Sequence, residues 1–170
     1  MKTKMKFTIL GILLLAVTSC EGQDSTEEEI KMDLINTDFP EAKQEVMETF
    51  GAIAQSIKDG DMDKLISFHA YGPKFTEFKN GERRNGSLAN EEHERSVFGA
   101  VTEVVKFEAD DLKIAVYGEV ANLTFHSNFQ LKFGEEMVYV FDQITLLFVN
   151  TPEGWKMVHE HHSPLKLKPL

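Results

Sequence analysis

The sequence predicts an α+β domain with an antiparallel sheet, and two features carry this prediction. Helix-type apolar spacing is confined to the first half of the domain, whereas strand-type alternation fills almost all of the second half. Helices followed by an uninterrupted series of strands are typical of α+β domains rather than of wound parallel sheets. With 170 residues, 42% hydrophobic and 27% charged, the chain has room for one such domain and an N-terminal extension.

Residues 1–19 have the pattern of an export signal. Three lysines among the first six residues precede an apolar stretch that is too short to span a membrane. The following Val17-Thr18-Ser19-Cys20 resembles the lipobox of bacterial lipoproteins, in which the cysteine is lipidated. An ordinary secretory signal with a chance cysteine, or a buried thiol, is the alternative. A single cysteine excludes an internal disulfide.

Residues 20–37 form an acidic tether in this interpretation, followed by a domain over 38–165 and a tail over 166–170. Removing residues 1–19 removes three lysines and no acids, so the formal charge falls from -10 to -13. Such a protein repels nucleic-acid phosphates, so no nucleic-acid partner is expected. We expect a lipid-anchored protein of the bacterial cell envelope, on the periplasmic or outer-membrane face, and no cofactor.

Three helices are expected. Pro40 opens the first, whose apolar residues recur at helical spacing as far as Asp59, and Gly60 ends it. Asp61 can cap a second, short helix over 62–68. A third helix is expected from Asn90 to about 101, after a loop over 82–89, and its Glu/His/Arg face is expected to be solvated.

Five strands are expected. The first ends at an Asn-Gly turn, the second has an interruption at two aspartates, and the third alternates clearly. The fourth is apolar on both faces, which predicts a central strand covered on each side. Their expected ranges are 71–78, 104–117, 120–133, 137–149 and 154–163.

The last strand contains the most informative pattern. A period of two sends Trp155, Met157, His159, His161 and Ser163 to one face, which we expect to face a cavity. This Trp-x-x-Val-His-x-His-x-Ser pattern resembles the last strand of SnoaL-like domains of the nuclear transport factor 2-like superfamily. It also resembles the association domain of calcium/calmodulin-dependent kinase II.

The resemblance implies a cone-like, curved antiparallel sheet wrapped around the long N-terminal helix, with a pocket near its mouth. It also implies a homodimer paired through the outer face of the sheet. We expect the pocket to bind a small, largely apolar molecule. The residues expected to line it are Tyr71, Phe75, Asn122, Thr124, Gln143, Thr145, Trp155, His159 and His161.

Three alternatives stay open. An isomerase- or dehydratase-like enzyme, similar to ketosteroid isomerases, would use Asp142 and His161 as an acid–base pair. A metal would need His159 and His161 with a third ligand, for which the sequence offers His126, Asp142 and His69. A non-catalytic dimeric scaffold would fill the cone with its own side chains.

Overall fold

The long helix predicted from the apolar stripe is α1 (Pro40–Asp59) in the computed structural model, which describes residues 31–166. It ends as predicted, because Gly60 adopts a left-handed conformation with φ of 69°. The export signal, Cys20 and most of the acidic tether lie outside the described residues, as do the last four residues of the tail. The predictions about them therefore stay predictions.

The two shorter helices differ in how well the sequence predicted them. In α2 (Met62–Ser67) the Asp61 side chain accepts a hydrogen bond from the Lys64 amide, as expected of an N-cap. Helix α3 (Ser87–Phe98) begins three residues before the predicted start. The preceding loop contains a two-residue strand, so the prediction of a continuous loop over 82–89 was wrong.

The strands form one open, curved, seven-stranded mixed sheet in the order β2-β1-β7-β6-β4-β3, with β5 paired to β4. Every pairing is antiparallel except that of β1 with β7, which is parallel and therefore departs from the predicted all-antiparallel sheet. The strands are β1 (Thr76–Lys79), β2 (Glu82–Arg83), β3 (Glu103–Tyr117), β4 (Val120–Phe133), β5 (Glu136–Val140), β6 (Asp142–Thr151) and β7 (Gly154–Pro164).

The predicted strand over 137–149 is divided in two. Ser127 of β4 is inserted at the division, where its hydroxyl donates to the Val140 carbonyl and accepts from the Asp142 amide. Strand β6 nevertheless lies at the centre of the sheet, between β4 and β7, as its two apolar faces predicted.

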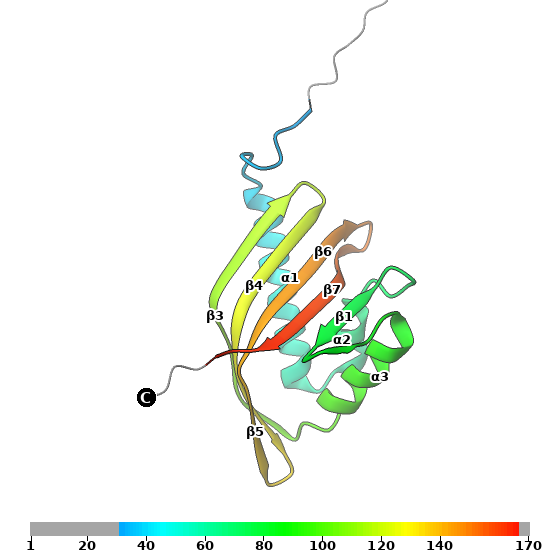
Figure 1. Ribbon diagram of the computed structural model, residues 1–170, viewed down its shortest axis with the longest axis vertical. Coiled ribbons are helices and arrows are strands. Elements are labelled where there is room, and N and C mark those ends of the chain that lie inside the picture. Colours follow the sequence, from blue (N-terminus) through cyan, green and yellow to red (C-terminus); the bar gives the residue numbers. More distant parts are fainter. Residues whose placement is uncertain (1–30, 167–170) are drawn as a thin grey trace, which may run out of the picture. The chain divides into compact units, whose positions relative to one another are not determined.

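Helix α1 packs against one face of the sheet, with α2 and α3 beside β1 (Figure 1). The core lies between α1 and this inner face, and it includes Val46, Ile53 and Phe148. Trp155 of β7 fixes the helix to the sheet, because its indole nitrogen donates to Glu45 of α1 over 2.9 Å. Among residues 31–166, no helix has the length and apolar character that crossing a bilayer requires.

A β-bulge in β7 determines which residues face the interior. Phe148 pairs with Met157, but the preceding residue Leu147 pairs with His159, so Val158 has no counterpart in β6. The extra residue changes the phase of the alternation. Trp155 and Met157 face the core as predicted, but beyond the bulge the buried side chain is that of Glu160, and His161 is exposed.

Candidate functional site

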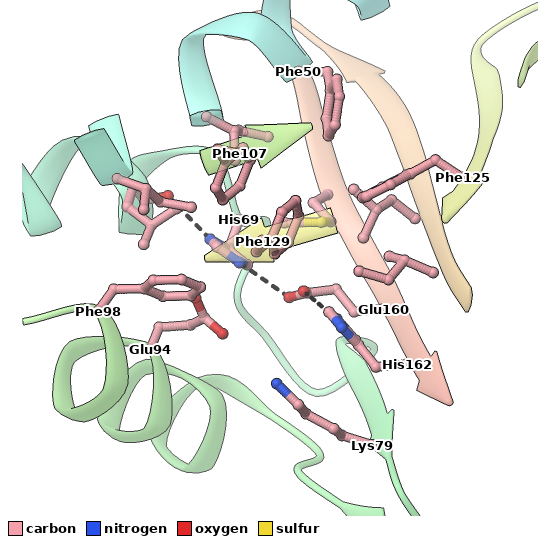
Figure 2. Close-up of a pocket in the computed structure, with 16 residues that line it drawn as sticks. Phe50, His69, Lys79, Glu94, Phe98, Phe107, Phe125, Phe129, Glu160 and His162 are labelled. Atoms are coloured by element: carbon pink, nitrogen blue, oxygen red, sulfur yellow. Dashed lines mark hydrogen bonds and ion pairs between the residues drawn. The ribbon is translucent and has the colours of Figure 1, made fainter. Parts of the chain in front are cut away.

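The inner face of the sheet and the three helices enclose an apolar pocket (Figure 2). It contains about 520 Å³ of space free of atoms, counted together with the solvent at its opening. Phenylalanines from α1, α3, β3 and β4 form much of its wall, and a few polar side chains gather at one end. The lining residues are Phe50, Ile53, Ile57, Leu65, His69, Lys79, Glu94, Phe98, Phe107, Phe125, Phe129, Ile144, Leu146, Met157, Glu160 and His162.

Glu160 is the centre of the polar end. His69 Nε2 lies 3.1 Å from its Oε1, and His162 Nε2 lies 3.3 Å from its Oε2. Burial alone would raise the pKa of Glu160, but the hydrogen bonds from His162 and His69 and the charges of these rings outweigh burial. The pKa of Glu160 is therefore held well below the usual range of a glutamate.

His69 faces hydrogen-bond acceptors with both ring nitrogens. Its Nδ1 donates to the Leu65 carbonyl over 3.2 Å, while its Nε2 meets the Glu160 carboxyl. The carbonyl can only accept, so the Nε2–Glu160 contact requires one further proton, carried either by the ring or by the carboxyl. The pair thus holds an exchangeable proton at the end of the pocket.

A second buried carboxylate, Glu77, lies next to this group and is 1% exposed. Arg84 donates to its Oε1 over 3.1 Å, and Asn90 donates to its Oε2 over 2.9 Å. The Asn90 carbonyl oxygen accepts in turn from the Tyr71 hydroxyl. Burial and the carboxylate of Glu94 raise the pKa of Tyr71, so this hydroxyl remains a donor.

Glu94 of α3 is 7% exposed and lines the pocket, and its carboxyl makes no hydrogen bond or ion pair with any residue in the described part of the chain. Burial, and then the charges of Glu160 and Glu77, raise the pKa of Glu94 well above that of an ordinary glutamate. Lys79 also lines the pocket, and its amino end points toward the carboxyl groups of Glu94 and Glu160 (Figure 2).

His93, the residue before Glu94, is half-buried. Burial, and then the charge of Arg84, lower the pKa of its ring. One carboxylate oxygen each from Glu77 and Glu94 and one ring nitrogen of His93 lie within 4.8 Å of one another.

Most of the predicted pocket residues lie on the opposite, outer face of the sheet. Those on β4 and β6 alternate along each strand with the buried core residues. His159 and His161 of β7 lie next to Phe78 of β1. The prediction that these side chains line the cavity was therefore wrong for Asn122, Thr124, Gln143, Thr145, His159 and His161.

The other predicted residues lie closer to the site. Tyr71 belongs to the polar network through Asn90, and the ring of Phe75 contacts the rings of Tyr71 and His69 edge to face. Trp155 is buried on the inner face, but it bonds to Glu45 and lines a different, shallow groove at the other end of α1.

The predicted pair of Asp142 and His161 is not brought together. Asp142 is opposite Pro164 in the β6–β7 ladder, whereas His161 is opposite Thr145. Asp142 is buried on the inner face, and His161 is exposed on the outer face. The bulge at Val158 is the physical reason, because it exchanges the faces of the imidazoles and Glu160.

The predicted metal alternative on His159 and His161 also finds no third ligand. Within residues 31–166, Glu77, His93 and Glu94 are the only His, Cys, Asp or Glu side chains that form a group of three with metal-ligand spacing.

The contribution of α3 had a signal in the sequence. Asn90, Glu94 and Phe98 are spaced by four residues, so they share one helical face. The apolar Phe98 marks that face as the inner one, and the expectation that the Glu/His/Arg face is solvated was wrong for Glu94. The β7 bulge had no comparable signal, since it depends on pairing with β6.

The class of protein is defined by three features: a long N-terminal helix, a curved mixed sheet packed on it, and a pocket between them. The chain belongs to the family of SnoaL-like domains, whose model matches residues 46–166. No curated protein matches the chain.

Solved structures confirm the fold. A provisionally assigned dehydratase of the nuclear transport factor 2-like family from Streptomyces avermitilis is 20% identical, with a TM-score of 0.68, over 76% of this chain and all of that chain. A superfamily protein from Salmonella enterica is 20% identical, with a TM-score of 0.66, over 76% and 95%. A provisionally assigned ketosteroid isomerase from Shewanella frigidimarina is 15% identical, with a TM-score of 0.59, over 72% and 97%.

Proposed function

We propose that the domain binds a small, largely apolar molecule in the pocket, with a polar group of that molecule against His69, Glu160 and His162. The observation that carries the proposal is the convergence of these three side chains at one end of an otherwise aromatic and aliphatic wall. Ligand pockets commonly combine apolar walls with a few polar groups that fix orientation.

The polar end favours a ligand that carries a hydroxyl or carbonyl group. The Nδ1 atom of His162 has no hydrogen-bond partner among the described residues, and the carboxylate of Glu160 has lone pairs that can accept from a ligand. A single oxygen atom can satisfy groups of this kind, whereas a fully apolar molecule would desolvate them without compensation.

The test uses 2-naphthol, a small aromatic molecule with one hydroxyl group, in calorimetric titrations of the full chain. We expect His162→Gln to weaken binding by about fivefold to tenfold, the effect of one lost hydrogen bond of about 1 kcal/mol. Leu146→Trp should abolish binding, because the larger side chain fills the pocket.

His161→Gln is the matched control, because its side chain is adjacent in sequence but lies on the outer face. It should leave the affinity unchanged. Binding that survives Leu146→Trp, or that is lost in His161→Gln and kept in His162→Gln, contradicts the proposed pocket.

Acid–base catalysis in an isomerase or lyase is the second candidate, and the proton shared by His69 and Glu160 favours it. The ionised carboxylate of Glu160, which is a weak base because its pKa is lowered, would remove a proton next to a carbonyl, and the His69 ring beside it would stabilise the negative charge that develops. The provisional names of two similar structures, a dehydratase and a ketosteroid isomerase, belong to this class of chemistry.

Proton exchange measures this candidate directly. In heavy water, the enzyme would exchange the α-protons of a cyclic ketone such as 2-cyclohexenone, and Glu160→Gln would abolish the exchange. If exchange with the wild-type protein is no faster than in buffer while 2-naphthol still binds, the result rejects catalysis and agrees with binding alone.

We also propose that Cys20 carries a lipid and anchors the domain in the bacterial envelope. The lipobox-like sequence before Cys20 supports this location, and more than one acyl chain gives stable anchoring. Cys20→Ala should move the protein from the membrane fraction to the soluble fraction, and a variant that stays with the membranes would contradict the anchor.

A further inference from the structure

The polar side chains of α3 and β1 form a second potential site beside the His69–Glu160–His162 group. Glu77 of β1 and His93 and Glu94 of α3 each offer one ligand-type atom, and all three atoms lie within 4.8 Å of one another. Two carboxylate oxygens and one imidazole nitrogen are typical of a metal ligand set.

The environment of Glu94 separates this cluster from an ordinary group of acids. Only 7% of Glu94 is exposed, yet no described residue donates a hydrogen bond to its carboxyl or pairs with its charge. The two neighbouring buried carboxylates do have partners, because Arg84 pairs with Glu77 and two histidines pair with Glu160. A buried carboxylate without a partner is unfavourable unless a proton or a cation compensates it.

In the described residues, every side-chain nitrogen or oxygen that is fully buried has a hydrogen-bond partner. The Glu94 carboxyl therefore reaches open space, and Glu94 lines the pocket. The ring of His93 likewise makes no hydrogen bond with any residue in 31–166, so its nitrogens are available.

We propose that Glu77, His93 and Glu94 bind a divalent transition-metal ion, with Zn²⁺ as the best-fitting ion. Tetrahedral Zn²⁺ holds oxygen and nitrogen ligands at about 2.0–2.1 Å, which places neighbouring ligand atoms about 3.4 Å apart. Atoms that already lie within 4.8 Å reach this spacing by small side-chain rotations. Ca²⁺ and Mg²⁺ need six or more ligands, mostly oxygen, so an imidazole-containing set of three suits them poorly.

The surrounding hydrogen bonds hold one of the ligands in place. Asn90 donates to Glu77 Oε2 and is itself fixed by the Tyr71 hydroxyl, while Arg84 holds Glu77 Oε1. Partners of this kind orient metal ligands in known sites. A carboxylate that accepts two hydrogen bonds still has lone pairs for a metal ion.

The charged side chains around the cluster have opposite effects on the binding of a cation. Arg84 and Lys79 are positively charged and weaken the attraction for a cation, whereas the buried carboxylates of Glu77, Glu94 and Glu160 strengthen it. Three protein ligands leave one position of a tetrahedral ion open, and Glu94 places the ion at the wall of the pocket. An ion there would attract an oxygen atom of a pocket ligand.

The test is a calorimetric titration of the chelator-treated full chain with Zn²⁺ alone, in mild detergent. We expect one Zn²⁺ per chain, with an affinity that falls about tenfold or more in Glu77→Gln, His93→Gln and Glu94→Gln. Glu92→Gln is the matched control, because Glu92 lies on the same helix but is exposed. It should leave the affinity unchanged.

The histidines of the outer face require a second control, since exposed imidazoles bind Zn²⁺ without a built site. His161→Gln should leave the one-to-one binding intact. Co²⁺ should give the strong visible absorption of a tetrahedral site in the wild type, and this absorption should be lost in Glu94→Gln.

Two results would overturn the proposal. One is the absence of stoichiometric Zn²⁺ binding by the wild-type chain. The other is binding that persists in Glu94→Gln but is lost in His161→Gln, which would assign the ion to the outer face. Because the readout is metal binding alone, neither result depends on whether 2-naphthol binds in the pocket.

Discussion

Glu160 shows how a single buried residue can define a site. It lies within the run His159 to His162, which consists of three histidines and this one glutamate. The structure buries the glutamate and places two histidines outside, and the two rings that contact Glu160 come from different parts of the chain, His69 and His162. The chemical character of the pocket therefore depends on the carboxylate.

We predict that Glu160→Gln lowers the free energy of unfolding near pH 7 by about 1–3 kcal/mol, the range for losing charged hydrogen bonds. The pKa of Glu160 is lowered in the folded protein, so its ionised form contributes stability above the unfolded pKa. This contribution is lost as the pH falls below about 4.5 toward the folded pKa. Urea denaturation at neutral and acidic pH measures both values.

The difference between wild type and Glu160→Gln should therefore narrow under acidic conditions. His161→Gln serves as the control on the same strand and should change stability little at either pH, because its side chain is exposed. An equal loss for Glu160→Gln at both pH values would show that the ionised carboxylate is not the stabilising species.

Single elements show where local sequence signals are sufficient. Helix α1 begins at Pro40 and ends at Gly60, as helix-capping preferences predict. Helix α3 has no side-chain cap and begins three residues before its predicted start, and its orientation buries Asn90 and Glu94. The ends of α1 thus follow from a few neighbouring residues, whereas the face that α3 buries follows from packing.

One glycine inside α1 and one at its C-cap should respond to alanine in opposite ways. Gly60→Ala should lower the free energy of unfolding by about 1–2 kcal/mol, because its φ of 69° is unfavourable for a residue with a Cβ atom. Gly51→Ala should raise it by about 0.5–1 kcal/mol, since Gly51 lies within the helix. Thermal and urea denaturation of both variants provide the measurement.

Neither substitution introduces a steric conflict, because a Cβ atom at either position has no neighbour within 4 Å. The pair therefore isolates the backbone contribution. Effects of the same sign at both positions would contradict the assigned end of the helix.

At the scale of the whole molecule, the two faces of the sheet have different roles. The inner face packs on α1 and forms the pocket, whereas the outer face carries half-buried polar and aliphatic side chains. Leu147 and Val149 point outward from the central strand β6, and a solvated sheet face rarely carries aliphatic residues at its centre. We propose that this outer face pairs with a second copy of the chain.

Sedimentation velocity of the full chain in detergent should show a homodimer, and Leu147→Glu should convert it to a monomer because it places a charge in the centre of the interface. Met47→Glu is the control, since Met47 is an exposed apolar residue of α1 and not of the sheet. A wild-type monomer, or a dimer that Met47→Glu dissociates and Leu147→Glu does not, contradicts pairing through this face.

The sequence by itself determined the order of the elements, the length of α1, the alternation of β4 and the central position of β6. These features depend on local periodicity, capping and turn chemistry, which are present in any short window of the chain. The Asn80-Gly81 turn is one example, since both residues adopt the positive φ that their types favour.

Only the tertiary structure decided which residues meet in the pocket. The parallel pairing of β1 with β7 joins segments that are about eighty residues apart, as the Thr76–His159 pair shows. The bulge at Val158 then turns Glu160 inward and two histidines outward. Both depend on contacts between strands that are distant in sequence, and a shift of one residue in such a contact exchanges the faces of every side chain that follows.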